Sequence, residues 1–165
     1  MRTANYAIII ASGTTVLALA RCIPPEAQLT VLTSAMNVAM ALLNCQQVEV
    51  IQLGGIVRHT SSSVTGEYAL RMLENFSGTK LFLGVDGIDL KYGLTTTNFM
   101  EASVNRAMID AAQKIIVLTD SSKFGRRGFG KICELDAVDQ IITDSGVSPK
   151  VVRELEELGI KVSIV

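Results

Sequence analysis

Short apolar segments rich in Val, Ile and Leu alternate along this chain with longer segments that have a helical spacing of apolar residues. The apolar segments predict buried strands over residues 7–11, 29–33, 49–53, 80–85, 114–119, 140–143 and 161–165. The segments between them predict helices over residues 16–22, 35–44, 67–75, 99–112 and 149–158. This alternation predicts an α/β fold with a mostly parallel sheet and helices on both faces.

The composition favours one compact domain over residues 1–165. Hydrophobic residues make up 48% of the chain and the mean hydropathy is +0.38, which suits strands buried on both faces. The sequence has neither a signal peptide pattern nor an apolar stretch near the ~20 residues that span a bilayer. We therefore expect a cytoplasmic protein without membrane contact. The widely spaced Cys22, Cys45 and Cys133 predict buried free thiols and no metal site.

The charge balance argues against specific DNA binding by this chain alone. It carries 15 basic and 16 acidic residues, for a net charge of −1, whereas nucleic-acid binders have a basic excess or a basic face. A local basic cluster, formed by Lys123, Arg126, Arg127 and Lys131, lies in a glycine-rich segment and is typical of a solvated loop.

The first predicted strand ends in a small polar loop that leads directly into the first predicted helix. Ser12, Gly13, Thr14 and Thr15 would place hydroxyl groups and free backbone N–H groups at the positive end of the helix dipole. That combination suits a phosphate group. Ser and Thr also cap helices that bind nothing, so the pattern alone leaves both interpretations open.

Five further loops that follow predicted strands are also small, polar or glycine-rich. They comprise residues 33–37, 54–58, 84–89, 93–96 and 120–125. Because the carboxyl ends of parallel strands meet at one edge of a sheet, these loops converge where α/β proteins bind ligands. Their shared chemistry predicts a site for a small, polyhydroxylated anion.

The ordered set of loops resembles the C-terminal effector-binding domain of DeoR-family transcriptional regulators. The motifs that carry the resemblance are Ser-Gly-Thr-Thr at 12–15, Gly-Gly at 54–55, Gly-Val-Asp-Gly-Ile-Asp at 84–89, Gly-Leu-Thr-Thr at 93–96, Asp-Ser-Ser-Lys-Phe-Gly at 120–125, and Arg58 and Glu101. The resemblance implies a fold like that of ribose-5-phosphate isomerase and CoA transferases. It also implies a bacterial repressor whose N-terminal winged helix-turn-helix domain lies outside this chain. The implied partners are a phosphorylated sugar effector, DNA through the absent domain, and further copies of the chain in a dimer or tetramer.

Loop positions and resemblance together give the expected ligand contacts. The phosphate is assigned to Ser12, Gly13, Thr14, Thr15 and Lys123, and the rest of the effector to Ser34, Asn37, Gly54, Arg58, Asp86, Gly87 and Glu101. We expect no catalytic residue, cofactor or metal. Structural roles compete at some positions: Asp86 and Asp89 could brace their loop, and Glu101 could complete a capping box with Asn98.

Departures from the family pattern bear on the function. Ala11 stands where family members often have an acidic residue, and Asn105 where many have a lysine, a change that is interpreted as a surface substitution.

The alternative function is a sugar-phosphate isomerase or deaminase. Ribose-5-phosphate isomerases have a Lys-Gly-Gly-Gly segment where this chain has residues 93–96, so the lysine that assists catalysis is absent. The sequence therefore favours a sensor over an enzyme.

Overall fold

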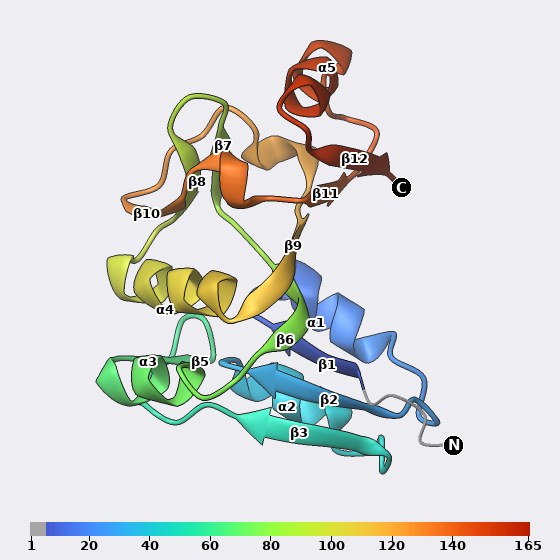
Figure 1. Ribbon diagram of the computed structural model, residues 1–165, viewed down its shortest axis with the longest axis vertical. Coiled ribbons are helices and arrows are strands. Elements are labelled where there is room, and N and C mark those ends of the chain that lie inside the picture. The colour runs from blue at the N-terminus through green and yellow to red at the C-terminus, as the bar shows by residue number, and fades with distance from the viewer. Residues whose placement is uncertain (1–5) are drawn as a thin grey trace.

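The computed structural model describes residues 6–165, and a seven-stranded sheet forms their centre (Figure 1). The strand order is β12-β11-β9-β6-β1-β2-β3, and every neighbouring pair is parallel. The strands are β1 Tyr6–Ile10, β2 Leu29–Thr33, β3 Val48–Gln52, β6 Gly78–Leu83, β9 Ala112–Leu118, β11 Gln140–Thr143 and β12 Lys161–Ile164. The predicted mostly parallel sheet is confirmed, and each predicted strand boundary lies within two residues of the observed one.

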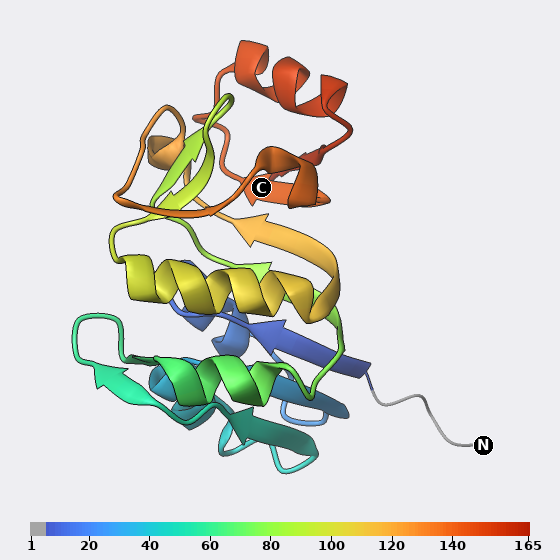
Figure 2. The same cartoon turned by 60° about the vertical axis from the view of Figure 1, so that its left-hand side comes forward.

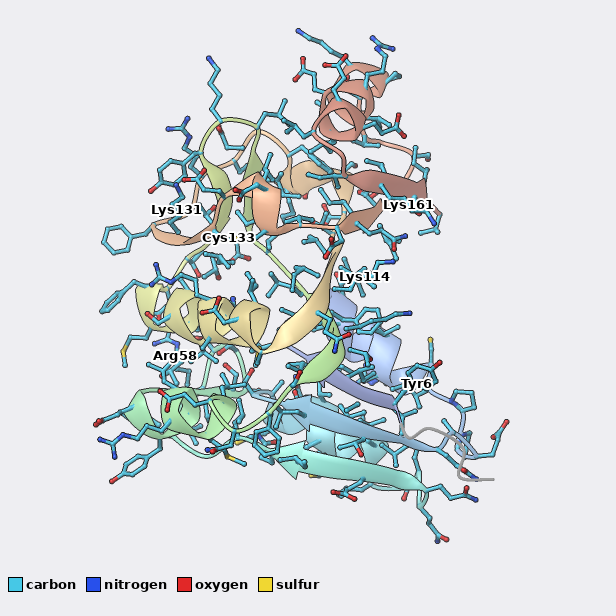
Figure 3. All side chains as sticks on the ribbon, viewed as in Figure 1. Tyr6, Arg58, Lys114, Lys131, Cys133 and Lys161 are labelled. Carbon is cyan, nitrogen blue, oxygen red and sulfur yellow. The ribbon has the colours of Figure 1, made fainter. Side chains whose placement is uncertain are left out.

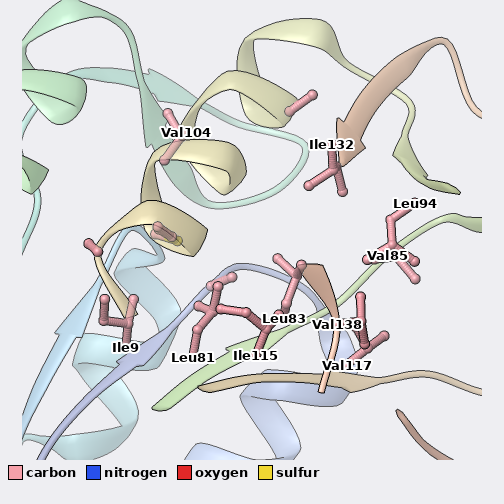
Figure 4. Packing of buried hydrophobic residues seen from close by; sticks show 14 of the residues in the cluster. Ile9, Leu81, Leu83, Val85, Leu94, Val104, Ile115, Val117, Ile132 and Val138 are labelled. Carbon is pink, nitrogen blue, oxygen red and sulfur yellow. The ribbon is translucent and has the colours of Figure 1, made fainter. Parts of the chain in front are cut away.

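Helices cover both faces of this sheet, as Figure 2 shows for the face that carries α3 and α4. The helices are α1 Thr14–Arg21, α2 Met36–Leu42, α3 Glu67–Leu73, α4 Phe99–Asp110 and α5 Pro149–Glu157. Ile10 packs with α1 and α2 in one buried cluster, whereas Ile9 packs with Leu81 and with α3, α4 and α5 in the other (Figure 4). Successive strand side chains point to opposite faces, so a sheet covered on both sides needs apolar residues at every position.

Two small antiparallel sheets were not predicted. The pair β4 Ile56–Arg58 and β5 Ser63–Thr65 forms a hairpin, and β7 Gly87–Asp89, β8 Gly93–Thr96 and β10 Gly130–Cys133 form a three-stranded sheet. Their strands have only three or four residues, and each strand of the three-stranded sheet begins with a glycine, so none of them gives a clear strand signal in the sequence. The three-stranded sheet lies above α4 in Figure 1, and its strands β8 and β10 contact that helix.

The cysteines differ in their exposure. Cys45 is buried as predicted, but the prediction is wrong for Cys22, which follows the end of α1 and is exposed, and Cys133 is only partly buried. Burial nevertheless raises the pKa of the Cys133 thiol to about 12, so this thiol stays protonated at neutral pH.

In residues 6–165 no helix has the length and apolar character needed to cross a membrane, and no cluster of His, Cys, Asp and Glu could hold a metal.

Candidate functional site

A cavity of about 330 Å³ opens at the carboxyl edge of the central strands. The strand order reverses at β1, because β2 and β3 are added on one side of it and β6, β9, β11 and β12 on the other. Open α/β sheets bind ligands at such a switch point. The cavity brings together eight of the predicted site residues: Ser12, Gly13, Thr14, Thr15, Arg58, Asp86, Glu101 and Lys123. These residues come from five separate segments, so their convergence agrees with the predicted meeting of strand-end loops.

The N-terminus of α1 forms one wall of the cavity and has no side-chain cap. Gly13 is the N-cap residue, with a φ of 134°, and no side chain accepts a hydrogen bond from the first turn. The first turn also contains no acidic residue. The first N–H groups of a helix have no partner within the helix, so those of α1 remain free to bind an anion together with the nearby hydroxyl groups. The structure thus rules out side-chain capping as the role of this loop.

Lys123 adds a positive charge to the same cavity. It ends a short 3-10 helix, η1 Ser121–Lys123, that follows β9, and it makes no ion pair within residues 6–165. Asp120 caps η1 by accepting hydrogen bonds from the hydroxyl group of Ser122 and then from its N–H group, which lower the pKa of Asp120. Asp144 Oδ2 accepts a hydrogen bond of 2.8 Å from Ser121 N. This bonding fixes the loop and leaves the lysine ammonium free.

Asp86 braces its loop with one carboxylate oxygen. Its Oδ2 atom accepts hydrogen bonds from Thr96 Oγ1 at 2.8 Å and from Thr97 N at 3.0 Å. Its Oδ1 atom makes no hydrogen bond to another described residue, and Asp86 lines the cavity. The structural role that competed with ligand binding is therefore present, yet half of the carboxylate stays available.

Arg58 and Glu101 form an ion pair at the edge of the cavity. Arg58 Nε lies 3.1 Å from Glu101 Oε1, and this contact joins the β4–β5 hairpin to the first turn of α4. Figure 3 labels Arg58 just below that helix. Asn98 caps α4 by accepting hydrogen bonds from Met100 N and Glu101 N. The Glu101 side chain binds Arg58 instead of returning to Asn98, so only half of the expected capping box forms. The two opposite charges cancel, so the pair adds no net charge to the cavity.

Asn105 corrects the sequence interpretation most clearly. It lies one helical turn after Glu101, is only 6% exposed and lines the cavity, so its assignment to the surface of α4 is wrong. Sequence reasoning also missed other lining residues that are mostly hydroxylated: Thr60, Ser61, Thr96, Thr97 and Thr119. Thr119 ends a predicted strand and Thr96 lies in one of the loops that were expected to converge, so their positions were usable signals, whereas Thr60 and Ser61 lie in the turn of an unpredicted hairpin.

Four predicted contacts do not line this cavity. Ser34 is buried, and its carbonyl group accepts a hydrogen bond from Val64 N at 3.0 Å, which anchors the β4–β5 hairpin. Asn37 is partly buried and its Oδ1 atom has no hydrogen-bond partner among the described residues. Gly54 is exposed before β4, and Gly87 packs in β7 against the backbone of Arg126. Any ligand contact at these four positions stays a prediction.

Asp89 serves the β7–β8 turn and lies outside the cavity. It accepts hydrogen bonds from Lys91 N and Tyr92 N and forms an ion pair with Arg127 at 3.0 Å. The Arg127 guanidinium first, and then the two backbone N–H groups, lower the pKa of Asp89 to about 2.

The Asp89 carboxylate gives an expected acid dependence of stability. Because its pKa is lower in the folded protein than its ordinary value of 3.8, its stabilising contribution is complete above about pH 4 and is lost as the pH falls towards 2. We expect the thermal midpoint to fall less steeply over this range in Asp89→Asn than in the original protein, with Asp120 and Asp144 supplying the remaining slope. Identical slopes for Asp89→Asn and the original protein would contradict the assignment.

Comparisons with known proteins bear on this geometry. A family described as the DeoR C terminal sensor domain matches residues 3–145. A protein of Escherichia coli O157:H7 that is named as an aga operon transcriptional repressor is 41% identical over 98% of this chain and 60% of its own length. The glycerol-3-phosphate regulon repressor of Escherichia coli K12 is 27% identical over 95% of this chain and 62% of its own length. The chain thus spans about 60% of the length of the curated relatives it matches.

Solved structures that resemble this chain have low sequence identity to it. The beta subunit of eIF2B from Chaetomium thermophilum has a TM-score of 0.52 at 13% identity, over 83% of this chain and 43% of that chain. Ribose 5 phosphate isomerase A from Neisseria gonorrhoeae has a TM-score of 0.49 at 12% identity, over 74% of this chain and 47% of that chain. At such identity the likeness to the eIF2B subunit concerns the fold alone, and the predicted α/β fold class is confirmed.

Proposed function

The chain belongs to the DeoR family, as a C-terminal sensor domain, and from this premise we propose that it binds a phosphorylated sugar or a related phosphorylated metabolite. The observation that carries the proposal is the uncapped N-terminus of α1, which shares one cavity with Lys123, a lysine without an ion pair in the described chain. Backbone N–H groups at a helix N-terminus bind phosphate oxygens, and a lysine ammonium adds a point charge. A cavity of about 330 Å³ lies at the lower end of the usual range for small-molecule sites.

Within the cavity, we assign different parts of the effector to different walls. The phosphate would contact residues 12–15 and Lys123, and Asp86 Oδ1 would accept hydrogen bonds from sugar hydroxyl groups. Because Arg58, Thr60 and Ser61 belong to the β4–β5 hairpin, ligand binding would also change the position or mobility of that hairpin. The Arg58–Glu101 ion pair links any such change to α4.

The proposed output is regulation of transcription in the cytoplasm. Relatives that extend beyond this chain are named as transcriptional repressors, so we propose that an N-terminal winged helix-turn-helix domain binds DNA and that the effector alters its affinity. A ligand shifts such an equilibrium only through its different affinities for the two states. A coupling of about 1–3 kcal/mol would change DNA affinity about 5- to 150-fold.

Association of several copies is part of the same proposal. Three large apolar side chains are exposed on neighbouring segments: Ile56 on β4, Phe99 at the start of α4 and Phe129 before β10. These segments are neighbours, since Arg58 of β4 pairs with Glu101 of α4 and Gly130 packs against the Phe99 backbone. Exposed apolar groups that lie together are typical of protein interfaces, which supports a dimer or tetramer.

Calorimetry with matched ligands tests the proposal. The chain would be titrated with a panel of hexose, pentose and triose monophosphates, with inorganic phosphate, and with the unphosphorylated parent compounds. We expect at least one monophosphate to bind, and its parent compound to bind at least about tenfold more weakly, because a phosphate makes several charge-assisted hydrogen bonds. Equal affinity for a phosphorylated compound and its parent would refute the phosphate site.

The alternative function, a sugar-phosphate isomerase or deaminase, is not favoured. The curated relatives are named as transcriptional regulators. An isomerase needs a base that moves a proton and a group that polarises the carbonyl. Asp86, Glu101 and Lys123 could supply such groups, but Glu101 is neutralised by Arg58. Incubation with ribose 5-phosphate and glucosamine 6-phosphate should give no product, whereas turnover that is abolished by Asp86→Asn would establish the enzyme instead.

A further inference from the structure

The strongest unexplained feature of the cavity is the side-chain amide of Asn105. The residue is 6% exposed and lines the cavity, on the α4 face that also carries Glu101. Side-chain hydrogen bonds on α4 involve Glu101, Ser103 and Arg106, and the Asn105 amide has no hydrogen-bond partner in residues 6–165. The Asn105 amide is not among the fully buried polar atoms that lack a partner, so it is accessible from the cavity. The occupant of the cavity is therefore the natural partner of this amide.

The charged groups around the cavity limit what that occupant can be. Five charged side chains line it: Arg58, Asp86, Glu101, Asp120 and Lys123. Arg58 and Glu101 neutralise each other, which leaves Lys123 as a cation without an ion pair in the described chain, beside the carboxylates of Asp86 and Asp120. One lysine and one helix N-terminus can hold one phosphate. A second anionic group would meet carboxylates without a further free cation, and like charges at close range repel each other.

We propose that Asn105 binds the effector directly and that it restricts the cavity to monophosphates whose other groups are neutral hydrogen-bonding groups. This inference rests on the proposed function and specifies its ligand class. An amide supplies two donors and one acceptor without charge, so it can donate to a ring or carbonyl oxygen and accept from a hydroxyl group. A lysine at this position would add a second cation and admit a second anionic group, whereas asparagine favours the neutral part of the ligand.

Two substitutions at position 105 test this role. Asn105→Leu keeps the size of the side chain and removes its hydrogen-bonding groups, so we expect the affinity for the tightest-binding monophosphate of the panel to fall about tenfold. The affinity for inorganic phosphate should change less than about twofold, because the amide contacts the rest of the ligand. The thermal midpoint of the ligand-free protein should change little, since the amide makes no hydrogen bond to another described residue. A merely structural Asn105 would instead lower this midpoint and leave the ligand preference intact.

Asn105→Lys tests the charge preference with ligands that differ by one phosphate. Fructose 6-phosphate and fructose 1,6-bisphosphate provide such a pair, as do the other monophosphates of the panel and their bisphosphates. We expect the original protein to prefer the monophosphate of each pair that binds, and Asn105→Lys to reduce this preference at least about tenfold, because the added cation attracts the second phosphate. Circular dichroism checks that both variants are folded. If the lysine variant is not, the preference of the original protein between monophosphate and bisphosphate tests the ligand class, and Asn105→Leu tests the contact.

The outcomes separate this inference from the proposed function. If neither inorganic phosphate nor any monophosphate binds, the proposed function fails and the inference fails with it. If monophosphates bind but none binds more tightly than inorganic phosphate, the role of Asn105 is overturned while the phosphate site stands. That role is also overturned if Asn105→Leu weakens inorganic phosphate and the sugar phosphate equally, or if a bisphosphate is the preferred ligand of the original protein.

Discussion

Replacing Lys123 by alanine is expected to weaken the binding of a sugar phosphate by about 10- to 100-fold. A hydrogen bond to a charged group contributes roughly 1.5–3 kcal/mol, and Lys123 is a lining cation without an ion pair in the described chain. Because Lys123 makes no ion pair there, its loss should leave the stability of the ligand-free protein within about 0.5 kcal/mol. Calorimetric titration and thermal unfolding of the same preparations measure both quantities.

Lys91→Ala is the matched control for this prediction. Lys91 is exposed in the β7–β8 turn, makes no ion pair in residues 6–165 and does not line the cavity. Its replacement removes the same charge from the molecule, so it measures how much the long-range electrostatic attraction of one lysine contributes to the affinity for the phosphate. Lys123→Arg keeps the charge and should retain most of the affinity. A loss of affinity in Lys91→Ala as large as that in Lys123→Ala would show that Lys123 has no direct contact with the phosphate.

The main sheet could be predicted from the sequence because each of its strands carries its own signal. Strands buried on both faces must be apolar throughout, as the run from Ile8 to Ile10 illustrates, and their predicted bounds were accurate to two residues. The small sheets carry no such signal. Strand β10 pairs with β8, which lies more than 30 residues earlier, and both are four residues long and begin with a glycine. Their pairing depends on tertiary contacts that no local pattern encodes.

The candidate site also has some residues that the sequence could predict and others that it could not. Ser12, Asp86 and Lys123 were predicted to converge because each follows a parallel strand, and parallel strands end at one edge. The Arg58–Glu101 ion pair joins residues 43 apart in the sequence, so its formation was not predictable. Asn105 did carry a usable signal. It lies three residues after Ala102 and three before Met108, which are both buried, and this helical spacing places it on the inner face of α4.

Gly93 supports the site from a distance, and its replacement by alanine is expected to cost about 3–5 kcal/mol of folding free energy. Gly93 begins β8 at a φ of +109°, where other residues are strained. A Cβ atom there would lie 2.1 Å from the carbonyl oxygen of Cys133 at the end of β10, so β8 and β10 would have to separate. For a chain of this size the thermal midpoint should fall by about 10–15 °C.

Gly159→Ala separates backbone strain at a positive φ from the steric contact with Cys133 as causes of this expected loss. Gly159 also has a positive φ, of 85°, but a Cβ atom there would have no neighbour within 4 Å. It should therefore lose only the backbone contribution of about 1–2 kcal/mol. Urea unfolding of both variants gives the difference, and equal losses would mean that the contact with Cys133 does not limit residue 93. Because β8 ends at Thr96, which donates to Asp86, folded Gly93→Ala should also bind sugar phosphates more weakly, whereas Gly159→Ala should bind them normally.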